Sequence, residues 1–169
     1  MKLYIVRHAE AIERNGTVAE EERYLTPKGR ITFRQTGAVL KKKGVLPDLV
    51  LTSPLVRAVQ TADILVEALS FEGEVQATAS LAPGFDLDAL RLLLDAIGPC
   101  RKVAIVGHEP DLGCLVSSLL GLEAPFRMKK GAVVALDVEP TVREASARFR
   151  WLVHNGRKPI RKLEDAGAE

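Results

Sequence analysis

Residues 3–11, LYIVRHAEA, decide the fold class. The apolar run 3–6 is short and rich in β-branched and aromatic side chains, as expected for a strand buried on both faces. Arg7 and His8 follow directly, so both side chains are expected where this strand leaves the core. An ordinary strand end does not need an arginine and a histidine side by side, and this pair therefore indicates a site.

Two helices carry clear start signals. Thr26 is expected to cap a helix over residues 28–43, which Pro27 opens and lysines in the last turn support. After the strand 48–53, Ser53 is expected to cap a second helix that begins at Pro54. Each strand is thus followed closely by a helix.

The same alternation continues along the chain and indicates a mainly parallel sheet with helices on both faces. The last two strands are joined by a connection too short for a helical crossover, so they should pair antiparallel. The predicted fold is a three-layer α/β/α sandwich with a mixed central sheet of about six strands. The further expected elements are strands at 74–78, 102–107, 132–138 and 147–153, and helices at 87–96 and 110–120.

One domain is expected over residues 1–156, because 169 residues suffice for a single core and no linker interrupts the pattern. Residues 157–169, RKPIRKLEDAGAE, are expected to form a charged, partly mobile tail. The polar segment 10–25 has no clear period and predicts a long loop over the end of the first strand.

The composition limits the function classes. Lys and Arg number 24 against 22 Asp and Glu, a net charge of +2, which argues against a nucleic-acid partner but permits a local basic pocket. No segment fits a signal peptide or a membrane span, so a soluble cytoplasmic protein without membrane contact is expected. Cys100 and Cys114 lack redox or zinc spacing and are expected as buried free thiols.

Cationic side chains from three segments should meet at one edge of the sheet. His8 ends the first strand, His108 ends the strand 102–107, and Arg57 lies in the first turn of the second helix. Ligands of open α/β sheets bind at the carboxyl ends of the parallel strands, where these residues lie with Arg7. Two arginines, two histidines and a helix N-terminus favour a phosphate.

Several alternatives are disfavoured by missing motifs. The phosphate loop GxxxxGK[ST] and the dinucleotide motif GxGxxG after a strand are both absent. The histidines have no carboxylates at a recognised metal spacing, so no metal is expected. Arginines can supply the charge that phosphoryl transfer needs, and no cofactor is expected either.

Three segments, LYIVRHAEA (3–11), SPLVRAVQTA (53–62) and VGHEP (106–110), resemble the ordered signatures of the histidine phosphatase superfamily, the phosphoglycerate-mutase-like group. The variants RHAEA, LTPKG and GHEPDL are most similar to its bacterial phosphohistidine phosphatase branch of the SixA type. The resemblance implies that His8 is a transiently phosphorylated nucleophile. It also implies that Arg7 and Arg57 bind the phosphoryl oxygens and that His108 donates a further hydrogen bond.

Relatives that hydrolyse alkyl phosphates carry an acidic proton donor in a longer middle segment. Here the segment 80–90, SLAPGFDLDAL, is short and offers only Asp86 and Asp88, whose plainer interpretations are a helix N-cap and a first-turn carboxylate. Glu109, beside His108, is a further candidate donor and also lies at a helix start.

An alkoxide needs a positioned acid to leave, whereas imidazole does not, which favours phosphohistidine as the substrate. The expected partner is a phosphorylated signalling protein, such as a histidine-containing phosphotransfer domain, or else a small phosphate ester. A general phosphomonoesterase acting on phosphoserine, phosphothreonine or small phosphates remains an alternative, as does a catalytically silent phosphate-binding module.

Overall fold

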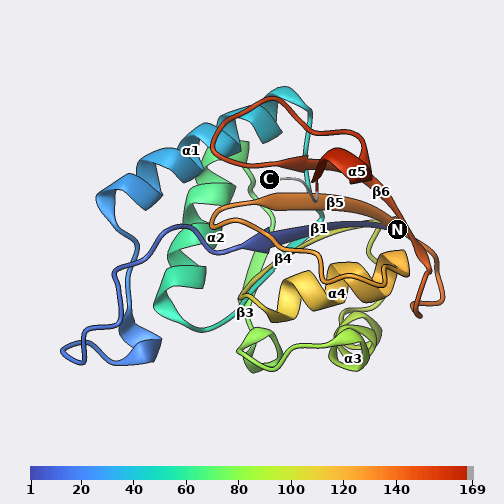
Figure 1. Ribbon diagram of the computed structural model, residues 1–169, viewed down its shortest axis with the longest axis horizontal. Helices are drawn as coiled ribbons and strands as arrows, with labels where there is room; N and C mark the ends of the chain where they lie inside the picture. Colours follow the sequence, from blue (N-terminus) through green and yellow to red (C-terminus); the bar gives the residue numbers. More distant parts are fainter. Residues whose placement is uncertain (167–169) are drawn as a thin grey trace.

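The computed structural model describes residues 1–166, which form a mixed six-stranded sheet with helices on both faces (Figure 1). The strands are β1 (Lys2–Arg7), β2 (Leu49–Thr52), β3 (Glu74–Ala77), β4 (Lys102–Gly107), β5 (Val133–Val138) and β6 (Ala147–Val153). The helices are α1 (Pro27–Lys42), α2 (Val56–Leu69), α3 (Leu87–Ile97), α4 (Asp111–Leu120) and α5 (Leu163–Ala166), with short 3₁₀ helices η1 (Glu20–Glu22) and η2 (Ala79–Leu81). The predicted three-layer α/β fold is confirmed.

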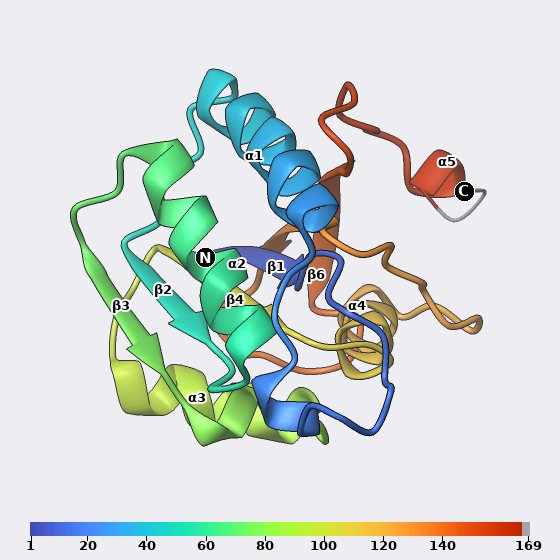
Figure 2. The same cartoon turned by 90° about the vertical axis from the view of Figure 1, so that its left-hand side faces the viewer.

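The strand order is β3-β2-β4-β1-β5-β6. β1 pairs with β4 in parallel and with β5 antiparallel, and β5 pairs with β6 antiparallel, as the short connection predicts. The helices after β1 and β4 pack on opposite faces of the sheet (Figure 2). The carboxyl ends of β1 and β4 therefore form a topological switch point, the place where open α/β sheets bind ligands.

The side chains of β1 point alternately to the two faces of the sheet, which explains why its apolar run is continuous. Leu3 and Ile5 face the core that α3 and α4 cover, whereas Tyr4 and Val6 face the core under α1 and α2. All four side chains are buried. A strand placed in the middle of a sheet and covered on both faces needs apolar residues at every position.

The start of α2 differs from the prediction. The helix begins at Val56 with Leu55 as N-cap, and no side chain caps it. Ser53 lies before that cap, where its hydroxyl accepts a hydrogen bond of 3.3 Å from the Leu55 amide. The prediction of Ser53 as N-cap and Pro54 as first residue was therefore wrong, and the Ser53 hydroxyl is available to another partner. Thr26 does cap α1, accepting from the Gly29 amide at 2.9 Å.

Part of the predicted tail packs on the domain. Ile160 pairs with Leu152 of β6, and Ala166 of α5 is buried. Both cysteines are free thiols as predicted, but Cys114 is exposed and Cys100 half-buried, so their predicted burial was wrong. Within residues 1–166, no helix combines the length and the apolar character that a membrane crossing requires.

Candidate active site

His8 and His108 lie side by side because their strands are neighbours in register. Arg7 of β1 pairs with Gly107 of β4, so each histidine is the next residue on one of two adjacent parallel strands. The His8 amide donates to the Gly107 carbonyl at 3.0 Å, and the two imidazole centroids lie 5.2 Å apart. The structure thus brings together two residues that are 100 positions apart in the chain.

The His8 ring has a defined orientation. Its Nδ1 lies 2.7 Å from the Ala9 carbonyl oxygen. Because a carbonyl only accepts, Nδ1 carries the proton and Nε2 carries the lone pair in the neutral ring. The Ala9 amide in turn donates to the Thr61 hydroxyl at 3.0 Å, which ties this turn to α2.

Burial holds His8 in its neutral form. The side chain is 9% exposed, and its pKa falls to about 3, chiefly because burial disfavours the imidazolium. The hydrogen bond to the Ala9 carbonyl opposes this shift, while the charges of His108, Arg57 and Arg7 lower the pKa further. Burial is thus a larger cause of the shift than the charges of the two arginines.

His108 is fixed by a serine from another strand. Its Nε2 lies 2.8 Å from the Ser53 hydroxyl, and both residues are buried. Burial lowers the pKa of His108 to about 4, with Arg57 adding to the shift and Asp111 opposing it. When the Ser53 hydroxyl donates to Nε2, the remaining ring proton of the neutral imidazole is on Nδ1.

Arg7 is held from the segment that precedes β5. Its Nη1 donates to the Met128 carbonyl, and the Met128 amide donates to the Glu109 carboxylate at 3.0 Å. Burial raises the pKa of Glu109, an effect that the Met128 hydrogen bond and the charge of Arg7 partly offset. Glu109 therefore supports the position of Arg7 through the Met128 main chain.

Arg57 is held by the loop that covers the end of β1. Its Nη1 donates to the Glu20 carbonyl at 2.7 Å, and its Nη2 lies 2.9 Å from the Glu20 carboxylate. Arg14 and Arg23 pair with the same carboxylate at 2.8 and 2.9 Å. The hydrogen bond from Arg14, together with the charges of Arg57 and Arg23, lowers the pKa of Glu20 to about 2. The segment 10–25 is thus ordered around one carboxylate.

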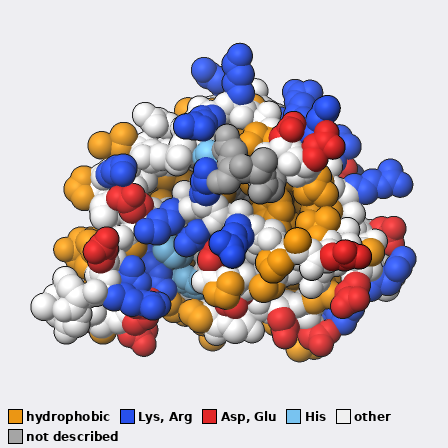
Figure 3. Space-filling model, viewed as in Figure 1, with side chains coloured by type: hydrophobic (Ala, Val, Ile, Leu, Met, Phe, Trp, Pro, Cys, Tyr) orange, Lys and Arg blue, Asp and Glu red, His pale blue; other side chains and the backbone are white. Residues whose placement is uncertain are grey.

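Three nitrogen atoms of this site are buried and, among residues 1–166, have no hydrogen-bond partner: Arg7 Nε, Arg57 Nε and His108 Nδ1. Buried polar groups are normally paired, because an unpaired one costs roughly 1–3 kcal/mol. On the face shown in Figure 3, Lys and Arg side chains gather around histidines. The arrangement suits an anion that accepts several hydrogen bonds at once.

Comparison with known proteins shows what this chain is similar to. A family model, the histidine phosphatase superfamily (branch 1), matches residues 3–82. An uncharacterized protein from Picosynechococcus is 37% identical over 115 residues, which cover 67% of this chain and 69% of that protein.

The chain belongs to the histidine phosphatase superfamily. It is 26% identical to the phosphohistidine phosphatase SixA of Escherichia coli over 153 residues, which cover 89% of this chain and 92% of SixA. A solved structure of the protein histidine phosphatase SixA complexed with tungstate superposes with a TM-score of 0.81 and 25% identity, covering 92% of this chain and 97% of that one.

The candidate proton donors of this histidine phosphatase lie in different surroundings. Asp86 caps α3, its carboxylate accepting from the Ala89 amide at 2.8 Å, and Asp88 pairs with Arg91 in the first turns of that helix. Both line a groove with Ser118 and other residues, and this lining includes none of Arg7, His8, Arg57 and His108. The N-cap interpretation of Asp86 is confirmed.

Sequence reasoning about this superfamily member missed three polar residues that hold the site. Ser53 was assigned to a cap, Thr61 was given no role, and Glu20 was assigned only to a loop. Each bonds to a partner more than 35 positions away. The motif SPLVRAVQTA does contain Ser53 and Thr61 on either side of Arg57. Their spacing around the start of this helix could have indicated that they lie near the site.

Proposed function

We propose that this chain is a cofactor-independent phosphatase that removes phosphate from phosphohistidine on a phosphorylated signalling protein. His8 is the nucleophile and becomes a covalent phosphohistidine. The observation that supports the proposal most is the grouping of a neutral imidazole beside three buried nitrogen atoms that have no partner among the described residues.

His8 has the protonation state that attack requires. The Ala9 carbonyl keeps the proton on Nδ1, which leaves the Nε2 lone pair for phosphorus. A folded pKa of about 3 keeps the ring neutral at physiological pH. No general base is needed to activate it.

Arg7, Arg57 and His108 are assigned to the phosphoryl oxygens. Phosphoryl transfer depends mainly on alignment of the attacking and leaving atoms and on electrostatic stabilisation of the equatorial oxygens. The unpartnered Nε atoms of both arginines and Nδ1 of His108 are fixed donors of this kind. The binding of tungstate, a tetrahedral oxyanion, by the similar SixA supports the assignment.

Turnover takes two displacements. In the first, the substrate ring is protonated by solvent on the nitrogen that does not carry phosphorus, the His8 Nε2 lone pair bonds to phosphorus, and the phosphorus–nitrogen bond of the substrate breaks. Its electron pair passes to the substrate ring, which leaves as neutral imidazole. In the second, a water oxygen bonds to phosphorus and the bond to Nε2 breaks, returning the electron pair to His8. Inorganic phosphate leaves and keeps the protons of the attacking water.

Substrate choice follows from the leaving group. The conjugate acid of imidazole has a pKa near about 6.5, so imidazole leaves without a strong acid at the site. Asp86 is occupied as a helix cap and Asp88 is paired with Arg91. Neither arrangement favours the proton donation that an alkoxide leaving group requires.

A comparison of substrates tests the proposal. Phosphate release is measured from phosphohistidine, phosphoserine and an aryl phosphate, with wild type and with His8→Ala, whose folding is checked by circular dichroism. Wild type should release phosphate fastest from phosphohistidine. An acid-labile phosphoryl group should be trapped on its His8 side chain, and folded His8→Ala should be inactive. Equal rates for the variant and wild type on all three substrates would refute the mechanism.

A second candidate, general phosphomonoesterase activity, is favoured by one observation. Glu109 is a carboxyl group near Arg7 whose pKa is raised by burial, and a protonated carboxyl can serve as the acid for an ester. Glu109→Gln keeps an acceptor for the Met128 amide while removing the acid. Selective loss of phosphoserine hydrolysis in this variant would support the esterase, whereas equal rates on phosphoserine would exclude Glu109 as donor.

A catalytically silent phosphate-binding module is the remaining alternative. Tight binding of tungstate without any trapped phosphohistidine would support it. The cytoplasmic location stays a prediction, as does the boundary of the domain at residue 156.

A further inference from the structure

A polar groove of about 460 Å³ opens beside the candidate active site. One wall is the first half of α1, and the other is formed by residues 129–131 and by residues near 155–157. Ala9 and Gly131 line its inner end. Because Ala9 follows the proposed nucleophile and the Gly131 amide donates to the His8 carbonyl at 3.1 Å, the inner end of the groove lies next to the backbone of the site.

Basic side chains outnumber acidic ones among the described residues that line the groove. Among the described residues that line it, Glu10 is the one acidic side chain, and the basic side chains are Lys28, Lys129, Lys130 and Arg157. The Lys28 ammonium lies 3.6 Å from the Glu10 carboxylate, but the Lys28 side chain is 79% exposed. An ion pair so accessible to water is weak, so it leaves most of the positive potential of Lys28 to solvent.

Glu10 does not serve Lys28 alone. The Glu10 carboxylate accepts a hydrogen bond of 3.1 Å from the hydroxyl of Thr26, the N-cap of α1. The same carboxylate is therefore shared between Lys28 and Thr26. Like charges in one groove repel one another and lower stability slightly. Side chains such as Thr32 and Gln35 make the floor polar, which suits an extended peptide with acidic residues better than an apolar helix.

The length of the groove limits what it can hold. Lining residues of α1 extend from Lys28 to Thr36, and eight residues at about 1.5 Å each span roughly 12 Å. Extended chain rises about 3.3 Å per residue, so this wall matches three or four residues. A groove of this length could hold the chain that flanks a phosphorylated side chain in the neighbouring site.

We propose that this groove is a docking surface for an acidic segment adjacent to the phosphohistidine of the partner protein. The inference rests on the proposed function and deepens it, because it names the feature of the partner that the phosphatase recognises. Complementary charge raises the association rate and gives specificity, and its effect falls with salt.

The test uses two synthetic peptides phosphorylated chemically on one histidine. One has three glutamates beside the phosphohistidine, and the other has three glutamines at the same positions. Wild type should have a kcat/KM about tenfold higher for the acidic peptide at low ionic strength, through KM rather than kcat, and about 0.5 M salt should remove the preference. The variant Lys28→Glu/Lys130→Glu should lose the preference while its rate on free phosphohistidine is unchanged.

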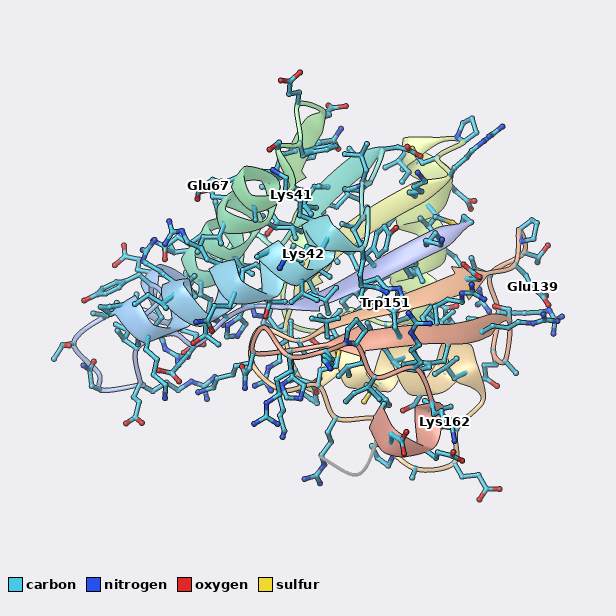
Figure 4. The ribbon with its side chains drawn as sticks, turned by 90° about the horizontal axis from the view of Figure 1, so that it is seen from above. Lys41, Lys42, Glu67, Glu139, Trp151 and Lys162 are labelled. Carbon is cyan, nitrogen blue, oxygen red and sulfur yellow. The ribbon has the colours of Figure 1, made fainter. Side chains whose placement is uncertain are left out.

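A matched control changes the same charge elsewhere on the same helix. Lys41→Glu/Lys42→Glu lies in the last turn of α1, which the labels of Figure 4 locate at one end of the helix. Neither lysine lines the groove. This variant should keep the preference for the acidic peptide. If both double variants lost the preference for the acidic peptide equally, the net charge of the protein alone would explain the preference. That result would overturn the docking proposal.

Binding of the unphosphorylated peptides separates docking from catalysis. Fluorescence anisotropy should show the acidic peptide binding wild type more tightly than the glutamine peptide and losing that advantage in Lys28→Glu/Lys130→Glu. Failure of wild type to cleave either phosphorylated peptide would refute the proposed function. Equal affinity of wild type for the two unphosphorylated peptides would refute the docking surface, whatever the cleavage assay gives.

Discussion

Replacing His8 by asparagine should make the folded protein less sensitive to acid. The asparagine amide can still donate to the Ala9 carbonyl, so the local hydrogen bond is kept while the titrating ring is removed. In the wild type, the pKa of His8 is lowered from an ordinary value of about 6.5 to about 3. The unfolded chain therefore binds more protons than the folded one between these two values, and stability falls as the pH falls through them.

The size of the effect follows from the two pKa values. At about pH 5, an unfolded His8 is almost fully protonated and a folded one almost fully neutral, a difference worth roughly 2 kcal/mol at about 1.36 kcal/mol per pH unit. His108, whose pKa is lowered to about 4, adds a similar amount in both proteins. A total stability of about 5–15 kcal/mol makes such a loss measurable.

Urea unfolding at about pH 7.5 and about pH 5 measures this difference. The free energy of unfolding of His8→Asn should fall by roughly 2 kcal/mol less than that of wild type between the two pH values. The comparison is a difference of differences, so any cost of the substitution at neutral pH cancels. Equal losses in the two proteins would show that His8 is not held neutral by the fold.

Three other substitutions give further predictions. Ser53→Ala should lower kcat/KM about 10- to 100-fold, and ¹⁵N NMR should show His108 losing its preference for the Nδ1–H tautomer, a change that a merely structural loss would not cause. Asp86→Ala should cost about 1 kcal/mol in urea unfolding as a lost N-cap, with phosphohistidine hydrolysis unchanged. Thr61→Val should cost about 1–3 kcal/mol in the same unfolding assay, because the buried Ala9 amide loses its acceptor, and should also lower kcat.

The sequence predicts those parts of the fold that depend on local pattern. The apolar run 3–6 marks a central strand because two-sided burial leaves no polar position in it. His8 and His108 can be paired in advance because adjacent parallel strands end at the same edge, and their side-by-side placement in the structure confirms the juxtaposition. Their catalytic roles stay predictions.

Contacts between distant segments could not be predicted in the same way. The sequence Ser53-Pro54 is equally compatible with a helix cap and with a side-chain hydrogen bond, and only the placement of β4 beside β2 brings His108 to the hydroxyl. Glu20 lies in a loop without periodicity, so nothing local links it to Arg57. The lowered pKa of His8 has burial as its largest cause, and the depth of burial depends on the whole fold.

The central position of β1 has a consequence for the lifetime of activity. The His8 main chain is bonded on one side to Gly107 and on the other to Gly131, so it belongs to the part of the sheet that has neighbours on both sides. Amide hydrogens there should exchange with deuterium only when the entire sheet opens. Loss of activity on heating should then coincide with global melting, since His8, the proposed nucleophile, cannot detach from the sheet on its own.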